Sequence, residues 1–261
     1  MVLLVSPAKD RHVAVTRLAQ ARRPFLTAEW RHLVMLNYEV ERAVLRPLVP
    51  AGTALDLWQD RALVSVVGFK FLSTRVLGMA VPFHRDFEEV NLRFYVRHDV
   101  PGAEARRGVV FVRELVPRAA IANLARLAYN EPYRAVPMRS VVPAGRVDTP
   151  GRLTYEWRTG GAWQSLAATA AGAPAVPEPG SENAFITEHH WGYTRQRDGS
   201  TVEYEVTNPV WRVGRGSGSR RRRGRAVRPG VRPCPRATIG LGSDRRRLTG
   251  RRLSAPSGGL T

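Results

Sequence analysis

The chain has 261 residues, 43% hydrophobic and 8% aromatic, which is an ordinary composition for one sizeable globular domain. Its 41 basic and 22 acidic residues give a net charge of +19, but 15 of the basic residues and one acid fall within residues 210–261. Residues 1–209 keep 26 basic and 21 acidic groups, a surplus of +5 that is unremarkable for a folded domain. The basic character therefore belongs to the C-terminal segment.

The only cysteine, Cys234, lies in that same segment, which excludes a disulfide framework and a thiolate metal site. A reducing, cytoplasmic setting fits this cysteine usage. No apolar run approaches the length of a membrane span, and the N-terminal residues lack a secretory core, so we expect a soluble cytoplasmic protein. Residues 1–24 show no sustained periodicity and are predicted to be a disordered leader.

The domain is predicted to start at residue 25. Residues 29–40 have a strand pattern, and residues 41–50 form a short helix closed by prolines. Residues 62–72 carry β-branched and aromatic side chains on both alternating faces, which predicts a central strand covered on both sides.

The next two strands carry the polar residues of interest. In residues 86–96 one face is apolar and the other holds Glu89, Asn91, Arg93 and Tyr95. Residues 108–116 are apolar on both faces apart from one charge on each, Arg113 and Glu114. From alternation alone, either of these two charges could be the buried one.

A helix is predicted from Pro117 to a stop at Asn130 and Pro132. A hairpin follows around residues 159–161, then a short helix that Ser181 caps, then a second hairpin that turns at Asp198 and Gly199. Together these elements predict an α+β domain that is mainly antiparallel β.

Four segments in this order resemble the YqjF-like bacterial family, a domain of unknown function related to acetoacetate decarboxylase: DFEEVNLRFYVR, GVVFVRELVPR, YNEPYRAVPM and TEHHWGYTRQRDGSTVEYEVTNPVW. The resemblance covers residues 24–211. It implies an acetoacetate-decarboxylase-like barrel with a central cavity and a few packed helices. The domain is therefore expected to span residues 25–211 and to be truncated at its C-terminal end.

The resemblance also marks a departure in chemistry. In the decarboxylase relatives, an Arg-Glu pair on a strand precedes a loop whose lysine forms a Schiff base with the keto acid. Arg113 and Glu114 resemble that pair, but Tyr133 and then Arg134 stand where the lysines of the relatives would be. Neither a phenol nor a guanidinium can form a Schiff base, so we expect no such decarboxylation.

The chain has only two lysines, Lys9 and Lys70. Lys70 lies on the strand predicted to be buried, where burial would lower its pKa and suit Schiff-base chemistry. The alternative, which we favour, is an ammonium that reaches water or pairs with a carboxylate.

The predicted ligand-binding residues come from these strands and the loop after the helix: Asn91, Arg93, Arg113, Glu114, Tyr129, Glu131, Tyr133 and Arg134. The arginines would bind an anionic group such as a carboxylate, while Glu114 or Glu131 would orient them or transfer protons. The alternative is a solvated loop with ordinary strand-edge charges and core aromatics. We assign no catalytic residue and no cofactor. His189 and His190 are adjacent on a strand and point to opposite faces, so we expect no metal site.

Residues 212–261 are rich in arginine, glycine, proline and serine and contain no lysine and no aromatic residue. We expect a disordered tail because such a segment cannot bury a core. Two explanations remain open: a basic arm that binds nucleic acid, or a shifted reading frame in a GC-rich gene. In the second case an edge strand at residues 203–206 would be left unpaired.

The function we expect is the binding of a small organic, anionic molecule in a central cavity, without Schiff-base chemistry. Whether a reaction is catalysed stays open. The alternative function is association with nucleic acid through the arginine-rich tail.

Overall fold

In the computed structural model of the chain, the described residues are 2–5, 26–80, 85–142, 152–206, 210–222, 232–241 and 248–253. They form three α-helices, α1 (Arg42–Leu45), α2 (Ala119–Tyr129) and α3 (Glu182–Thr187), and a 3-10 turn, η1 (Arg46–Leu48). The strands are β1 (Val2–Val5), β2 (Leu26–Val40), β3 (Ala54–Leu55), β4 (Ala62–Val76), β5 (Met79–Ala80), β6 (Phe87–His98), β7 (Arg106–Val116), β8 (Tyr133–Ala135), β9 (Met138–Val141), β10 (Arg152–Thr159), β11 (Ala162–Ala175), β12 (Trp191–Arg195), β13 (Thr201–Val206), β14 (Val213–Arg222), β15 (Arg232–Leu241) and β16 (Leu248–Leu253).

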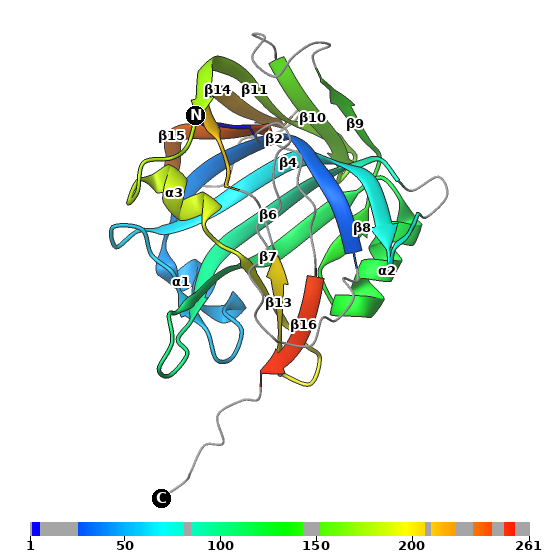
Figure 1. Cartoon of the computed structure of the whole chain (residues 1–261). Helices are drawn as coiled ribbons and strands as arrows, with labels where there is room; N and C mark the ends of the chain where they lie inside the picture. The colour runs from blue at the N-terminus through cyan, green and yellow to red at the C-terminus, as the bar shows by residue number, and fades with distance from the viewer. Residues whose placement is uncertain are drawn as a thin grey trace, which may run out of the picture.

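All these strands belong to one sheet, whose main path runs β16-β13-β12-β7-β6-β4-β2-β15-β1-β14-β11-β10-β9. Most neighbours are antiparallel, and the parallel pairs are β7 with β12, β7 with β8 and β1 with β15. This confirms the predicted α+β class with mainly antiparallel strands. Figure 1 shows the sheet strongly bent, with α2 beside β8 and with α1 and α3 toward the opposite side.

The predicted barrel is corrected in one respect, because the sheet is open. Its hydrogen-bonded path ends at β16 on one side and at β9 on the other, and these two strands do not pair with each other among the described residues. The sheet therefore bends around an interior without closing on itself.

The strand predicted to be central, β4, lies between β2 and β6, and residues 62–69 are all buried. One side packs against residues of β10 and β11, among them Tyr155 and Leu166. This layer comes so close that a Cβ atom on Gly68 would lie 2.7 Å from Cδ2 of Tyr155. Gly68 is therefore the residue that lets the β10–β11 layer pack directly on β4.

The polar face of β6 is buried as well, which alternation could not show. Glu89, Asn91, Arg93 and Tyr95 all lie in the interior, on the same side as the aromatic cluster around Phe69 and Phe87. We call this side of the sheet the cavity face. Burying polar groups is costly unless they find partners, so the arrangement of these residues requires an explanation.

A β-bulge in β7 decides which of the two neighbouring charges enters the interior. Arg93 pairs with Phe111 and Leu92 pairs with Arg113, so Val112 is left without a partner. Residues opposite each other in a ladder share a face, which places Phe111 and Glu114 on the cavity face. Glu114 is therefore buried and Arg113 is exposed.

The two predicted helix ends are confirmed. Asn130 adopts a left-handed conformation with φ of 56°, and its backbone N–H bonds to the carbonyl of Arg126, which ends α2. At α3 the Ser181 hydroxyl accepts a hydrogen bond from the backbone N–H of Ala184 at 3.2 Å.

The structure differs from the predicted disordered leader and tail in four segments. β1 pairs with β15, β14 pairs with β11, β15 pairs with β2, and β16 covers β13 at residues 201–206. The edge at residues 203–206, which the shifted-frame explanation would leave unpaired, is covered by β16 in this structure. The prediction weighed side-chain burial, whereas pairing at an open strand edge uses backbone groups that nearly every residue carries. The remainder of residues 1–24 lies outside the described residues.

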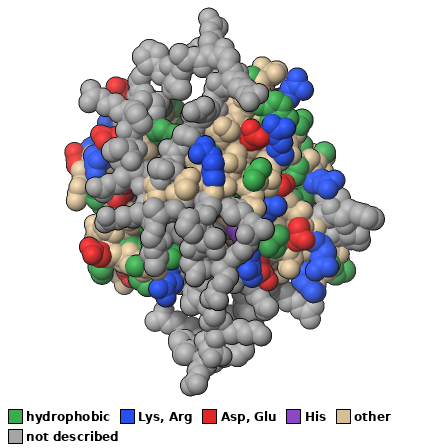
Figure 2. All heavy atoms as spheres, turned by 90° about the horizontal axis from the view of Figure 1, so that it is seen from above, with side chains coloured by type: hydrophobic (Ala, Val, Ile, Leu, Met, Phe, Trp, Pro, Cys, Tyr) green, Lys and Arg blue, Asp and Glu red, His purple; other side chains and the backbone are tan. Residues whose placement is uncertain are grey.

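On the face shown in Figure 2, basic side chains are interspersed with acidic ones around the rim of the described residues. This mixture agrees with the small charge surplus of residues 1–209. None of the described helices combines the length and the apolar character that a membrane crossing requires.

Candidate functional site

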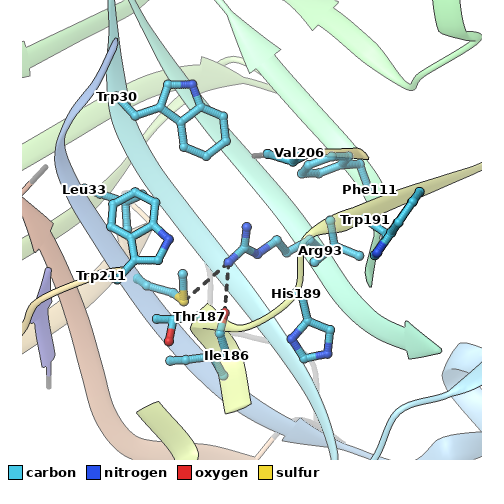
Figure 3. A pocket seen from close by; sticks show the side chains of 12 residues that line it. Trp30, Leu33, Arg93, Phe111, Ile186, Thr187, His189, Trp191, Val206 and Trp211 are labelled. Atoms are coloured by element: carbon cyan, nitrogen blue, oxygen red, sulfur yellow. Dashed lines mark hydrogen bonds between the residues drawn. The ribbon is translucent and has the colours of Figure 1, made fainter. Parts of the chain in front are cut away.

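A small cavity lies on the cavity face of the sheet, with walls from β2, β6, β7, α3, the start of β12 and the end of β13 (Figure 3). Its free volume of about 20 Å³ has room for roughly one water molecule. Most of the lining side chains are apolar or aromatic: Trp30, Leu33, Met35, Val109, Phe111, Ile186, Trp191, Val206 and Trp211. The lining is completed by Thr187, Arg93 and His189. The positive charge of Arg93 therefore lies among mostly apolar side chains, which screen a charge much less than water does.

Arg93 is the charged group of this cavity, and only 9% of the residue is exposed. One guanidinium nitrogen, Nη2, donates to the carbonyl of Ile186 at 3.4 Å and lies 3.9 Å from the sulfur of Met35. The bond to Ile186 is long compared with a usual N–H···O distance of about 2.9 Å, and a thioether sulfur is only a weak acceptor. The Nε donor is buried without any hydrogen-bond acceptor among the described residues.

Arg93 also forms no ion pair with a carboxylate within the described ranges. Removing a guanidinium from water without a counter-ion is strongly unfavourable, and buried charges are normally paired. Arg93 therefore has unused capacity to bind an anion.

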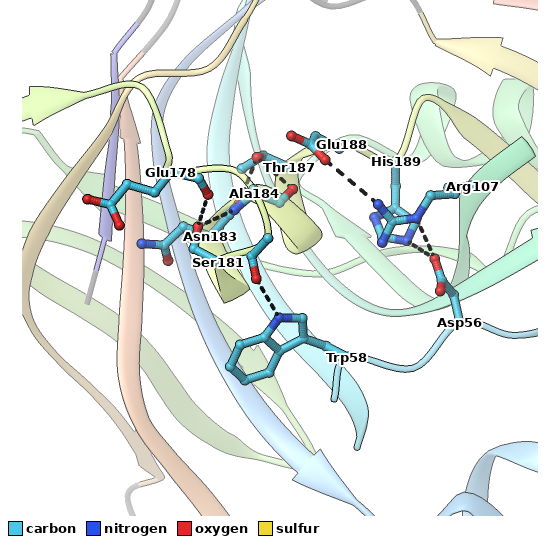
Figure 4. Close-up of polar contacts among 11 residues, drawn as sticks. Asp56, Trp58, Arg107, Glu178, Ser181, Asn183, Ala184, Thr187, Glu188 and His189 are labelled. Carbon is cyan, nitrogen blue, oxygen red and sulfur yellow. Dashed lines mark hydrogen bonds and ion pairs between the residues drawn. The ribbon is translucent and has the colours of Figure 1, made fainter. Parts of the chain in front are cut away.

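His189 lines the same cavity and is fixed from several sides (Figure 4). Its Nε2 lies 2.9 Å from Oδ2 of Asp56, which also accepts a bond of 2.8 Å from Nε of Arg107. The imidazole packs 4.7 Å from the ring of Tyr95 and 4.9 Å from the ring of Phe185. These contacts hold the imidazole in one orientation.

The charge states of this group follow from its surroundings. Burial lowers the pKa of His189 to about 4 and outweighs the bond to Asp56, which acts in the opposite direction. Burial alone would raise the pKa of Asp56, but hydrogen bonds from His189 and Arg107 bring it below its usual value. At neutral pH Asp56 is thus ionised and His189 is neutral.

The neutral imidazole has a single N–H, and the ionised Asp56 can only accept, so this proton resides on Nε2. Nδ1 therefore carries a lone pair. This atom is buried and has no hydrogen-bond partner within the described part of the chain. Two residues that line the cavity thus carry unused polar atoms, a donor on Arg93 and an acceptor on His189.

A polar chain beneath the cavity positions Tyr95, on which the imidazole packs. The hydroxyl oxygen of Ser65 lies 2.6 Å from Oδ1 of Asn37 and 2.5 Å from the hydroxyl of Tyr95. All three residues are buried. Such satisfied networks make a buried site rigid.

A second polar group on the cavity face consists of buried carboxylates and their donors. Glu89 accepts from Nδ2 of Asn91 at 2.9 Å and from the hydroxyl of Tyr133 at 3.0 Å. The hydroxyl of Tyr204 donates to Glu131. Glu114, opposite Asn91 in the ladder, is buried beside them.

An open surface hollow of about 440 Å³ lies next to this group. It is lined by Arg113, Arg126, Asn130, Glu131, Pro132, Tyr133, Arg134 and Arg197. The four arginines are exposed, and none of them pairs with a carboxylate in the part of the chain that is described.

Seven of the eight residues predicted from the sequence are thus divided between three places. Arg93 alone lines the inner cavity, and Asn91 and Glu114 lie in the buried carboxylate group. Arg113, Glu131, Tyr133 and Arg134 meet at the surface hollow. The backbone of Tyr129 ends α2, and its side chain lies outside the described residues.

Sequence reasoning missed the place of His189 in the cavity lining and its contact with Asp56. Strand alternation predicted that only one of the two histidines faces inward; His189 is buried and His190 is exposed, although both precede β12 and lie outside any strand. It could not decide which of the two points inward. Asp56 follows the short strand β3 without any distinguishing pattern, so no signal in the sequence could have found it.

Lys70 lies on the side of β4 opposite the cavity face, because its neighbours Phe69 and Phe71 belong to the interior cluster. Its ammonium lies 3.7 Å from Glu88, which confirms the pairing favoured from the sequence. Lys9 lies outside the described residues.

We predict that acetoacetate followed by borohydride leaves Lys70 unmodified, because a paired ammonium directed away from the cavity cannot meet a bound keto acid. Mass spectrometry of proteolytic peptides measures this directly. Lys9 serves as the internal control for non-specific reductive alkylation. A reduced adduct on Lys70 well in excess of that on Lys9 would contradict the prediction.

Among the described residues there is no group of three or more histidine, cysteine or acidic side chains that could hold a metal ion.

Comparison with known proteins identifies relatives of this chain. The sequence profile of DUF2071, described as an uncharacterized conserved protein family, matches residues 27–241. The protein YqjF of Bacillus subtilis is 26% identical over 173 residues, which cover 65% of this chain and 67% of YqjF. The profile match extends beyond Trp211, where the resemblance read from the sequence stopped.

Solved structures show a similar fold. Acetoacetate decarboxylase of Legionella pneumophila has a TM-score of 0.62 at 12% identity and covers 94% of this chain and 93% of its own. The enduracididine biosynthesis enzyme MppR complexed with pyruvate has a TM-score of 0.62 at 14% identity, covering 92% of this chain and 94% of its own. At these identities the likeness concerns the fold alone, which is that of acetoacetate-decarboxylase-like proteins.

Proposed function

The chain belongs to the DUF2071 family, and on that premise we propose that it binds a small organic carboxylate in the inner cavity through Arg93. One observation carries the proposal: a guanidinium only 9% exposed, without a counter-ion among the described residues and with an unbonded Nε. A carboxylate accepts two parallel N–H bonds from the arginine fork.

Charge balance supports an anion with a single charge. Arg107 already pairs with Asp56 at 2.8 Å and with the exposed Glu188 at 3.7 Å, and His189 is neutral at pH 7. Arg93 is the remaining cation of this cavity. One carboxylate would therefore neutralise the site.

The free volume of about 20 Å³ is smaller than a three-carbon acid, so binding requires movement of side chains in the cavity wall. The contacts of Arg93 with Ile186 and Met35, at 3.4 and 3.9 Å, are weak enough to exchange for a carboxylate. The complex of MppR with pyruvate is an example of a small carboxylate held by a protein of this fold. We expect the ligand to be a cytoplasmic metabolite and its binding to be non-covalent.

The test is thermal unfolding with and without formate, acetate, propionate and pyruvate, each compared with a neutral amide of similar size. At a hundredfold excess over Kd, a ligand stabilises by about 2.7 kcal/mol, which raises Tm by several degrees. We expect the acids, and not the amides, to stabilise the wild type. Arg93→Gln should abolish the effect, while Arg113→Gln, an exposed arginine one strand away, should retain it.

A second variant keeps the test decisive if Arg93→Gln folds poorly. Arg93→Met removes a buried charge and keeps the volume, a change that is often neutral or stabilising. We expect its Tm without ligand to equal or exceed that of the wild type and its response to acids to be lost. Stabilisation of Arg93→Met by the same acids would refute the proposal.

A further inference from the structure

The cavity lining offers a second polar atom for a ligand besides the guanidinium of Arg93, namely Nδ1 of His189. Arg93 reaches the cavity from β6, and His189 reaches it from the segment between α3 and β12. The Nε of Arg93 can only donate, whereas the Nδ1 of neutral His189 can only accept. Figure 3 shows both side chains among the residues that line the cavity, with the guanidinium of Arg93 directed toward Ile186.

We infer that His189 accepts a hydrogen bond from a hydroxyl group next to the carboxylate that Arg93 binds, so that the cavity selects a 2-hydroxycarboxylate. This inference rests on the proposed function and specifies its ligand class. A carboxylate without a neighbouring donor would leave Nδ1 buried and unbonded, which is unfavourable.

The group next to the carboxylate must be a donor, which excludes a keto oxygen. A hydroxyl and an ammonium both donate, but they differ in charge. The groups that face His189 are Asp56, Arg107 and Arg93, and with a bound carboxylate their charges already cancel. An ammonium would add an uncompensated cation close to two arginines, so the site favours a neutral hydroxyl.

The imidazole of His189, and with it the direction of the lone pair on Nδ1, is held in place by protein contacts alone. Asp56 holds Nε2 at 2.9 Å, and Asp56 is itself held by Arg107 and by its backbone N–H bond of 3.0 Å to the carbonyl of Tyr95. The rings of Tyr95 and Phe185 contact the imidazole at 4.7 and 4.9 Å. Such preorganisation lets a single hydrogen bond discriminate between ligands, since no ordering has to occur on binding.

The experiment compares four three-carbon acids by calorimetry at pH 7: propionate, lactate, pyruvate and alanine. We expect the wild type to bind lactate on the order of tenfold more tightly than propionate or pyruvate, with alanine weakest. His189→Phe keeps the aromatic packing but removes the acceptor, so lactate and propionate should bind it equally. His190→Phe, the same substitution at the exposed neighbour, should preserve the preference.

A spectroscopic readout keeps the inference falsifiable if His189→Phe misfolds. In ¹⁵N-labelled wild-type protein, lactate should shift the imidazole Nδ1 resonance of His189, and propionate should leave it nearly in place. Equal binding of propionate and lactate by the wild type, or an unchanged preference in His189→Phe, would overturn this inference alone. If none of the acids binds, the proposed carboxylate function is refuted as well.

Discussion

A chain that ends at Trp211 is expected to lose its cooperative thermal transition and to become insoluble. The deletion removes β14 from β11, β15 from β2 and β16 from β13. The two long strands β2 and β11 and the shorter β13 would then present unpaired backbone groups to solvent, and such edges promote aggregation. Differential scanning calorimetry and the soluble fraction after expression measure the outcome.

The matched control is a chain that ends after Leu253, which keeps every described strand. We expect it to unfold at the temperature of the full chain. A soluble chain ending at Trp211 with a sharp transition at that same temperature would show that the C-terminal strands do not stabilise the domain. In that case a dispensable basic arm that binds nucleic acid becomes the better account of residues 212–261.

Acid should destabilise the wild type more than His189→Phe. The pKa of His189 is about 4 in the folded protein, against 6.5 for the ordinary group. Between these values the unfolded chain binds a proton that the folded protein excludes, so lowering the pH through this range favours unfolding. The integrated effect is about 3 kcal/mol, fully developed near pH 4 and absent above the ordinary pKa.

The measurement is urea unfolding of both proteins at intervals from pH 4.5 to 7.5. His32 and His190 also have pKa values lowered by desolvation, but both residues are present in both proteins, so their contributions cancel in the difference. Asp56 remains ionised in the wild type over this range because its pKa is lowered. If the free energy of unfolding depended on pH in the same way for the wild type and His189→Phe, protonation of His189 would not destabilise the fold. That result would contradict a buried neutral imidazole.

The sequence allowed the main strands and both helix ends to be predicted, because periodicity and capping are local. Burial on both sides of residues 62–69 follows from an apolar pattern on both faces, and the structure confirms it. Alternation correctly grouped the polar residues of β6 on one face. Their burial, however, depends on α3 and β13, which are distant in the sequence and pack against this face. Local patterns contain no information on such contacts.

In the candidate site, too, local patterns could be predicted from the sequence and contacts between distant residues could not. Arg93 was predicted as a ligand-binding residue, and it is the member of the predicted group that lines the inner cavity. Arg113 and Arg134 were predicted with it but lie at the surface hollow, because a bulge in β7 and the short strand β8 direct them outward. His189 and Asp56 are 133 residues apart, so only the folded chain shows that they form one unit.

The unpaired Val112 has a consequence for the relatives of this chain. Along a paired strand, successive side chains point alternately inward and outward, and a bulge shifts this alternation by one residue. The position of the bulge therefore decides whether Arg113 or Glu114 points into the interior. If the extra residue followed Glu114, the unchanged sequence would turn Arg113 inward beside Asn91 and Glu114 outward. The interior would then hold two guanidiniums and suit a dianion. Relatives whose bulge lies elsewhere in this strand are therefore expected to prefer ligands of a different charge, even without a substitution in the cavity.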